Sequence, residues 1–212
     1  NYACHPVCLD HTNRLLSADY PGYLARRLRE ETGAVVLFTN GAAGDINPER
    51  KGSFSFAEDL GHALAAEALH VLEGLAYRDA ADLRVAGETL ELPLAALPAS
   101  AELKSQISSY QAALAEAEAA GDALNVKVQR AMLGWAEETL AGAMRGDLPT
   151  VVPAEIQVIA LGGIGLAGIP GEIFSELGKE IKDRARPREV WVLGYANNDV
   201  GYIATRQAYA LG

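Results

Sequence analysis

Cysteine, positive charge and long apolar runs are all scarce in this sequence. It has two cysteines in 212 residues, so no disulfide framework defines the fold. Its 18 lysines and arginines face 28 aspartates and glutamates, and the net charge of −10 argues against binding to a nucleic-acid backbone. Half of the residues are hydrophobic, yet no apolar run reaches the roughly 20 residues that cross a bilayer. We therefore expect a folded globular chain with no transmembrane segment and no nucleic-acid partner.

The two cysteines and the ends of the sequence give information about the cellular compartment of the protein. If residues 1–6 form a strand, the backbones of Cys4 and Cys8 lie roughly 13 Å apart, which is too far for a disulfide. Free thiols favour a reducing compartment such as the cytoplasm. The sequence begins inside an apparent strand without a methionine, so we interpret it as a piece of a longer protein, incomplete at both ends. Its targeting therefore stays open.

Hydrophobic patterns in the first half of the chain alternate between helix and strand. Residues 34–39 form a continuous apolar run rich in β-branched side chains, which predicts a buried strand, and small residues follow it in a loop. Apolar spacing predicts helices over residues 22–32 and 56–75. A strand over residues 1–6 and a half-buried strand over residues 84–92 complete this half.

The second half contains a segment of different composition. Residues 100–146 are rich in alanine, glutamate, glutamine and leucine, with a break at Gly121-Asp122, which predicts a helical hairpin. Gly162-Gly163 predicts the turn of a β-hairpin over residues 154–169. A helix from Glu172 to about residue 185 and a strand over 189–195 follow. We expect an α/β fold with a mixed sheet, flanking helices and the helical hairpin inserted into a single domain, residues 1–212.

Three residues that could bind a metal have ordinary structural explanations when each is taken alone. His5 ends a strand before a proline, where a hydrogen-bonded structural histidine is common. Glu172 is expected in the first turn of a helix, where the helix dipole favours an acidic side chain. Tyr202 fits a half-buried strand aromatic. No HExxH or CxxC spacing occurs, so spacing alone does not establish a metal site.

The loop at residues 40–48, NGAAGDINP, is the most unusual local feature. Glycines after a strand allow backbone amides to approach an anion or a developing oxyanion closely. The loop is neither a Walker loop nor a GxGxxG fingerprint. A tight turn and an active-site loop explain it equally well, because Asp45 and Asn47 can also stabilise a turn before Pro48.

Taken in order, several segments resemble the neutral/alkaline, non-lysosomal ceramidase family. The matching pieces are NYACHP (1–6), LSADYPGY (16–23), NGAAGDINP (40–48), GIPGE (168–172) and GYANNDVGYIAT (194–205). Their joint occurrence is far more specific than any single piece. The helical hairpin has no matching piece.

This resemblance implies a zinc-dependent hydrolase whose metal is bound by two histidines, a glutamate and a tyrosine. His5, Glu172 and Tyr202 match one histidine, the glutamate and the tyrosine. The other histidine lies, in the family, in a segment N-terminal to Asn1. The family's catalytic serine, in Gly-Asp-x-Ser-Pro, is replaced here by Asn47.

An amide cannot act as an acyl-accepting nucleophile, but Asn47 can donate a hydrogen bond while zinc-activated water attacks. We therefore expect a zinc-dependent amidohydrolase acting on an N-acyl or other linear amide, with Zn²⁺ as cofactor. In this scheme Asn47, Asp45 and Gly44 form the catalytic loop, and Asn40 and Gly41 face the substrate or its oxyanion. The substrate is a small or lipid-like amide, and the resemblance points toward sphingolipid metabolism.

Two other functions stay open. The chain can be a non-catalytic metal-binding or ligand-binding domain that lost the family serine, or a metal site for phosphate or sugar esters in which Asp45 helps to bind a cation. Family members are often secreted, whereas free cysteines favour the cytoplasm. The sequence leaves compartment and oligomeric state undecided.

Overall fold

In the computed structural model, residues 1–76, 82–186 and 189–211 are described, and they divide into two compact units. The first comprises residues 1–90 and 153–212, and the second residues 91–152. Within the described part, no helix is both long enough and apolar enough to cross a membrane. The architecture is mixed α/β, as the sequence predicted. The proposal of a single domain with an inserted hairpin stays a prediction.

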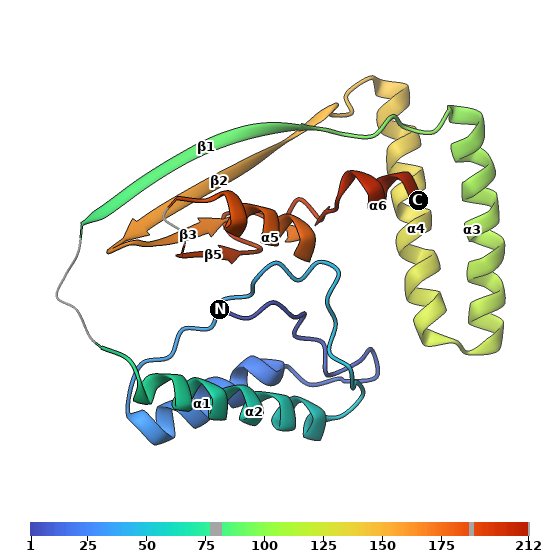
Figure 1. The fold of residues 1–212 in the computed structure, drawn as a ribbon. Helices are drawn as coiled ribbons and strands as arrows, with labels where there is room; N and C mark the ends of the chain where they lie inside the picture. Colours follow the sequence, from blue (N-terminus) through green and yellow to red (C-terminus); the bar gives the residue numbers. More distant parts are fainter. Residues whose placement is uncertain (77–81, 187–188, 212) are drawn as a thin grey trace. The chain divides into compact units, whose positions relative to one another are not determined.

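Two helices near the start of the first unit pack against each other (Figure 1). Helix α1 (Asp19–Thr32) ends at Gly33 in the left-handed conformation, and α2 (Phe54–Glu73) begins at Ser53, whose side chain accepts from the amide of Ser55. The helices meet at Gly61, where a Cβ would lie 2.6 Å from the carbonyl oxygen of Tyr20. Both predicted helices are confirmed. Helix α1 starts three residues, and α2 two residues, before its predicted first residue.

The main sheet has four strands in the order β1-β2-β3-β5: β1 (Leu83–Pro93), β2 (Val151–Leu161), β3 (Ile164–Gly168) and β5 (Glu189–Leu193). Strands β2 and β3 are antiparallel, while β3 and β5 are parallel, so the sheet is mixed. Gly162 and Gly163, both at positive φ, form the predicted hairpin turn. Strand β1 is almost entirely exposed, so the prediction that it is half-buried was wrong.

A second, two-stranded sheet pairs β4 (Glu172–Ile173) with β6 (Tyr202–Ile203) in parallel. The short helix α6 (Arg206–Leu211) follows β6. Helix α5 (Ser175–Arg184) begins three residues after Glu172, so the prediction that Glu172 opens this helix was wrong. Backbone pairing with the segment at 201–203 takes precedence there over helix formation. Ile173 of β4 belongs to an apolar cluster with Ala42, Ile169 and Val192.

The prediction of a buried strand over residues 34–39 was also wrong. Val35 and Leu37 are 88% and 85% exposed, while Val36 and Phe38 pack against the α1–α2 core. The predicted strand over residues 1–6 is also absent. Among the described residues, that segment has one parallel bridge, between Tyr2 and Asn40, the residue that directly follows the apolar run. A strand forms only where a neighbour supplies hydrogen bonds, and here the pairing is limited to this bridge.

The second unit contains the predicted helical hairpin, α3 (Ser100–Ala120) and α4 (Ala123–Arg145), drawn as two neighbouring helices in Figure 1. Gly121 ends α3 in the left-handed conformation, and Asp122 caps α4 by accepting from the amide of Asn125. The break at Gly121-Asp122 is confirmed.

Candidate metal and hydrolase site

Glu172 and Tyr202 lie side by side because they are register partners in the β4–β6 pair. The amide of Glu172 donates to the carbonyl of Gly201 at 2.9 Å, and that of Phe174 donates to Ile203 at 3.0 Å. Side chains at paired positions of neighbouring strands point to the same face. The backbone therefore presents a carboxylate and a phenol together.

His5 reaches the same carboxylate from the N-terminal segment. Its backbone amide donates to the carbonyl of Ile46 at 2.9 Å, which ties it to the loop at residues 40–48. Its Nε2 lies 3.3 Å from Oε2 of Glu172 and 3.4 Å from the carbonyl oxygen of Gly44. His5 is 8% exposed, so this contact is shielded from water. The structure thus brings together all three residues that the sequence proposed as metal ligands.

Two tyrosine hydroxyls converge on Glu172. Burial raises the pKa of Tyr202, and the charge of Glu172 and a side-chain hydrogen bond to it act in the same direction. Burial also raises the pKa of Tyr195, again followed by the charge of Glu172 and a hydrogen bond to it. Both phenols are therefore neutral near pH 7, and the Tyr202 hydroxyl can donate to the carboxylate. The Tyr195 hydroxyl has one proton, which it donates either to the carboxylate or to Nδ1 of His5, 3.1 Å away.

The donor set fits zinc in kind and spacing. Two ligands of one tetrahedral zinc, each about 2.0–2.2 Å from the metal, are roughly 3.3–3.5 Å apart. The 3.3 Å between Nε2 of His5 and Oε2 of Glu172 matches this spacing, although a long hydrogen bond matches it as well. No cluster of three or more His, Cys, Asp or Glu side chains suited to a metal occurs in the described part of the chain. This set has only two such residues, and a tyrosine is its third donor.

Gly44 and Gly41 hold the loop against the ligand-bearing segments. The amide of Gly44 donates to the carbonyl of Ile173 at 2.9 Å, and that of Gly41 donates to Tyr2 at 2.8 Å. A Cβ on Gly44 would overlap the carbonyl oxygen of Glu172. Both amides are therefore engaged in backbone pairing, and a role for them at an oxyanion stays a prediction.

Asp45 and Asn47 lie on the exposed side of the same loop. The carboxylate of Asp45 accepts from the amide of Ser175 at 2.6 Å and from its hydroxyl at 2.8 Å, so it caps α5 from a distant part of the chain. The side-chain oxygen of Asn47 accepts from Nζ of Lys51 at 2.9 Å. The catalytic roles proposed for Asp45 and Asn47 stay predictions.

Asn40 joins two backbone segments near the site. With its amide oriented for hydrogen bonding, the nitrogen donates to the carbonyls of Cys4 and Tyr2 at 2.9 and 3.0 Å. Its backbone carbonyl accepts from Gly194 at 3.0 Å. Asn40 therefore fixes the segment that carries His5, and contact with a substrate stays a prediction.

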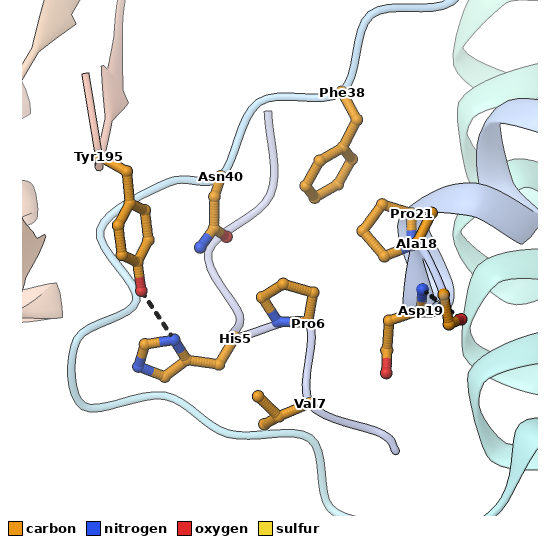
Figure 2. A pocket seen from close by; sticks show the side chains of 10 residues that line it. His5, Pro6, Val7, Ala18, Asp19, Pro21, Phe38, Asn40 and Tyr195 are labelled. Atoms are coloured by element: carbon orange, nitrogen blue, oxygen red, sulfur yellow. Dashed lines mark hydrogen bonds between the residues drawn. The ribbon is translucent and has the colours of Figure 1, made fainter. Parts of the chain in front are cut away.

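A cavity of about 460 Å³ opens beside His5, and Figure 2 shows the side chains around it. Its apolar wall includes Pro6, Pro21 and Phe38, while Asn40 and Tyr195 lie on the His5 side. The volume and lining suit a small or chain-like apolar group.

Tyr195 is the site residue that the sequence did not indicate. It follows β5 and adopts φ +58°, and its hydroxyl lies 3.1 Å from Nδ1 of His5 (Figure 2). A tyrosine at positive φ cannot be recognised from apolar spacing. Its place next to Gly194 in a loop after a strand was the available signal.

Comparison with known proteins finds a likeness of fold. Neither a family model nor a curated protein matches the sequence. Among solved structures, the chain is similar to neutral ceramidase from Pseudomonas aeruginosa, with 18% identity and a TM-score of 0.57. It is also similar to a ceramidase complexed with C2, with 18% identity and a TM-score of 0.58. The matches cover 99% of this chain but 39% and 40% of those chains. The chain therefore shares the fold of a part of neutral ceramidase.

Proposed function

We propose that this chain contributes most of a zinc-dependent hydrolase site that cleaves a linear, N-acyl-type amide. The observation that carries the proposal is the convergence of His5 and Tyr202 on the carboxylate of Glu172, from segments far apart in sequence. The ceramidase fold supports it, because the solved structures that share the fold are named as ceramidases. A bound zinc ion would supply a water of lowered pKa and polarise the substrate carbonyl.

The residues around this set have separate tasks in the proposal. His5, Glu172 and Tyr202 bind the metal, and Tyr202, which is 57% exposed, marks the side open to a substrate. The side-chain oxygen of Asn47 accepts from Lys51, so its NH₂ group is the part that can donate to a substrate oxygen. The apolar cavity beside His5 supports an apolar substituent on the substrate.

Zinc titration of the purified chain tests the metal half of the proposal. We expect binding close to one equivalent, weakened at least about tenfold by His5→Ala or Glu172→Gln because each removes a donor. His62→Ala and Glu180→Gln are matched controls, since His62 contacts Tyr23 on α1 and Glu180 pairs with Arg184 on α5. Equal zinc binding by all five proteins, or none by the wild type, would refute a site at these residues.

The rival function, a binding domain without catalysis, is favoured by Asn47 at the family's serine position. A panel of N-acyl amides and esters separates the two functions. Turnover that disappears with His5→Ala supports the hydrolase. Zinc binding without turnover, not restored by Asn47→Ser, supports the binding domain.

A further inference from the structure

Tyr195 adopts a backbone conformation that its residue type disfavours. Its φ of +58° lies in the left-handed region, where bulky side chains are rare and strained. Backbone hydrogen bonds secure it on both sides: the amides of Tyr195 and Ala196 donate to Gly171 and Ile169 at 3.2 and 3.0 Å. Gly171 directly precedes Glu172. A strained residue fixed by the segment that carries a proposed ligand points to a functional constraint.

The side chain of Tyr195 contacts the far nitrogen of His5. Its hydroxyl lies 3.1 Å from Nδ1, while Nε2 of the same ring lies 3.3 Å from Glu172. The rings of Tyr195 and His5 meet edge to face, with centroids 6.5 Å apart. His5 is therefore contacted at both nitrogens, at Nε2 by Glu172 of β4 and at Nδ1 by Tyr195, which follows β5.

A phenol hydroxyl suits this position because it both donates and accepts hydrogen bonds. It can donate to Nδ1 when Nε2 carries the proton, and accept from Nδ1–H when Nε2 offers its lone pair. A histidine that binds a metal is commonly oriented by such a contact at its other nitrogen.

We infer that Tyr195 is a positioning residue that orients the His5 imidazole so that Nε2 faces Glu172 and is available to bind a metal. Tyr195 acts on His5 through the hydrogen bond to Nδ1 and the edge-to-face contact. The part of this inference that concerns zinc rests on the proposed function.

Nitrogen-15 NMR of the metal-free chain tests the orientation directly. The chain has four histidines, and the His5 signals are assigned by their loss in His5→Ala. We expect Tyr195→Phe, which keeps the ring and removes the hydroxyl, to shift the His5 Nδ1 resonance. Tyr23→Phe is the matched control, because Tyr23 contacts His62 on α2. An unchanged Nδ1 resonance in Tyr195→Phe would overturn the inference.

Zinc titration tests its consequence for binding. We expect Tyr195→Phe to weaken zinc binding by about 10- to 100-fold, and Tyr23→Phe to leave it unchanged. Equal affinity of Tyr195→Phe and wild type would overturn the role in metal binding. If the wild type binds no zinc, the proposed function fails, and the NMR comparison alone decides whether Tyr195 positions His5.

Discussion

Two glycines of the candidate site differ from two glycines of the α3–α4 hairpin in what surrounds them. At the site, Gly44 and Gly171 let one backbone approach another, since a Cβ on either would overlap the carbonyl oxygen of Glu172 or Gly201. In the hairpin, Gly121 and Gly134 have open space where a Cβ would stand, and only Gly121 has a positive φ. The site is therefore assembled by long-range backbone contacts, and the hairpin by local helix signals. Substitutions that distinguish these two kinds of contact test the comparison.

Gly44→Ala should have the largest effect. The new methyl group must displace the backbone of Glu172, so we expect the free energy of unfolding to fall by roughly 2–3 kcal/mol. Zinc affinity should fall with it, because Glu172 moves away from His5. Urea denaturation and zinc titration measure the two effects. Wild-type values for both would show that the loop does not need this close approach.

Asp45→Ala should remove the cap of α5 and lower the free energy of unfolding by about 1 kcal/mol. Asp122→Ala is the matched change at the start of α4, where the carboxylate accepts from the amide of Asn125, and we expect a similar loss. Only Asp45→Ala should also weaken zinc binding, because Asp45 belongs to the loop that contacts Glu172. If the two variants bind zinc with equal affinity, Asp45 caps α5 without affecting the metal site.

Gly134→Ala should raise the free energy of unfolding instead of lowering it. Gly134 lies inside α4, and apart from the helix's own backbone no atom lies within 4 Å of the place that the new methyl group would take. Alanine is also the better helix former. We expect a gain of up to about 1 kcal/mol in the free energy of unfolding, measured by urea denaturation. A loss of stability would show that α4 is packed more closely there than the structure indicates.

The smallest effect concerns pH and Cys8, which is free and buried in an apolar cluster with Cys4, Tyr20 and Ala57. Burial first, and then the charge of Asp19 and a hydrogen bond to it, raise the pKa of Cys8 from 9.0 to about 12. The pKa of Cys8 is higher in the folded than in the unfolded chain, so the protonated thiol contributes to the stability of the fold. This contribution to the free energy of unfolding is complete below pH 9 and is lost as the pH rises from 9 toward 12. We expect the free energy of unfolding to be lower by up to about 1 kcal/mol at pH 9.5 than at neutral pH.

Denaturation at pH 7.5 and pH 9.5 measures this loss, and Cys8→Ala provides the comparison. The variant lacks the thiol and should show a smaller decrease between the two pH values. An equal decrease in both proteins would assign the pH dependence to other groups.

Local signals were enough to predict the helical hairpin and the β2–β3 turn. Gly121, Gly162 and Gly163 adopt positive φ without the steric cost of a side chain, and Asp122 caps α4 through a neighbouring amide. The apolar run at 34–39 was misleading, because apolar composition gives no information about whether a partner strand is present. Glu172 was placed in a helix for a similar reason, since pairing with residues 201–203 cannot be read from its neighbours.

The candidate site was predicted only through the ordered resemblance of five segments. His5, Glu172 and Tyr202 each had a structural explanation, and no spacing rule joins residues so far apart. Tyr195 was not predicted because its role depends on an unusual backbone angle and on a histidine 190 positions away. Contacts of this kind follow from the tertiary fold.

The β4–β6 pair has a consequence for insertions and deletions. Glu172 and Tyr202 are matched by two short strands, so the number of residues between Tyr195 and Tyr202 fixes where the phenol lies. Changing that number by one would move the pairing by about 3.3 Å and turn the phenol to the opposite face. The exposed side chain of Asn198 can therefore vary, whereas the length of its segment cannot. Asn197 is also exposed, but its φ of +69° favours asparagine or glycine at that position.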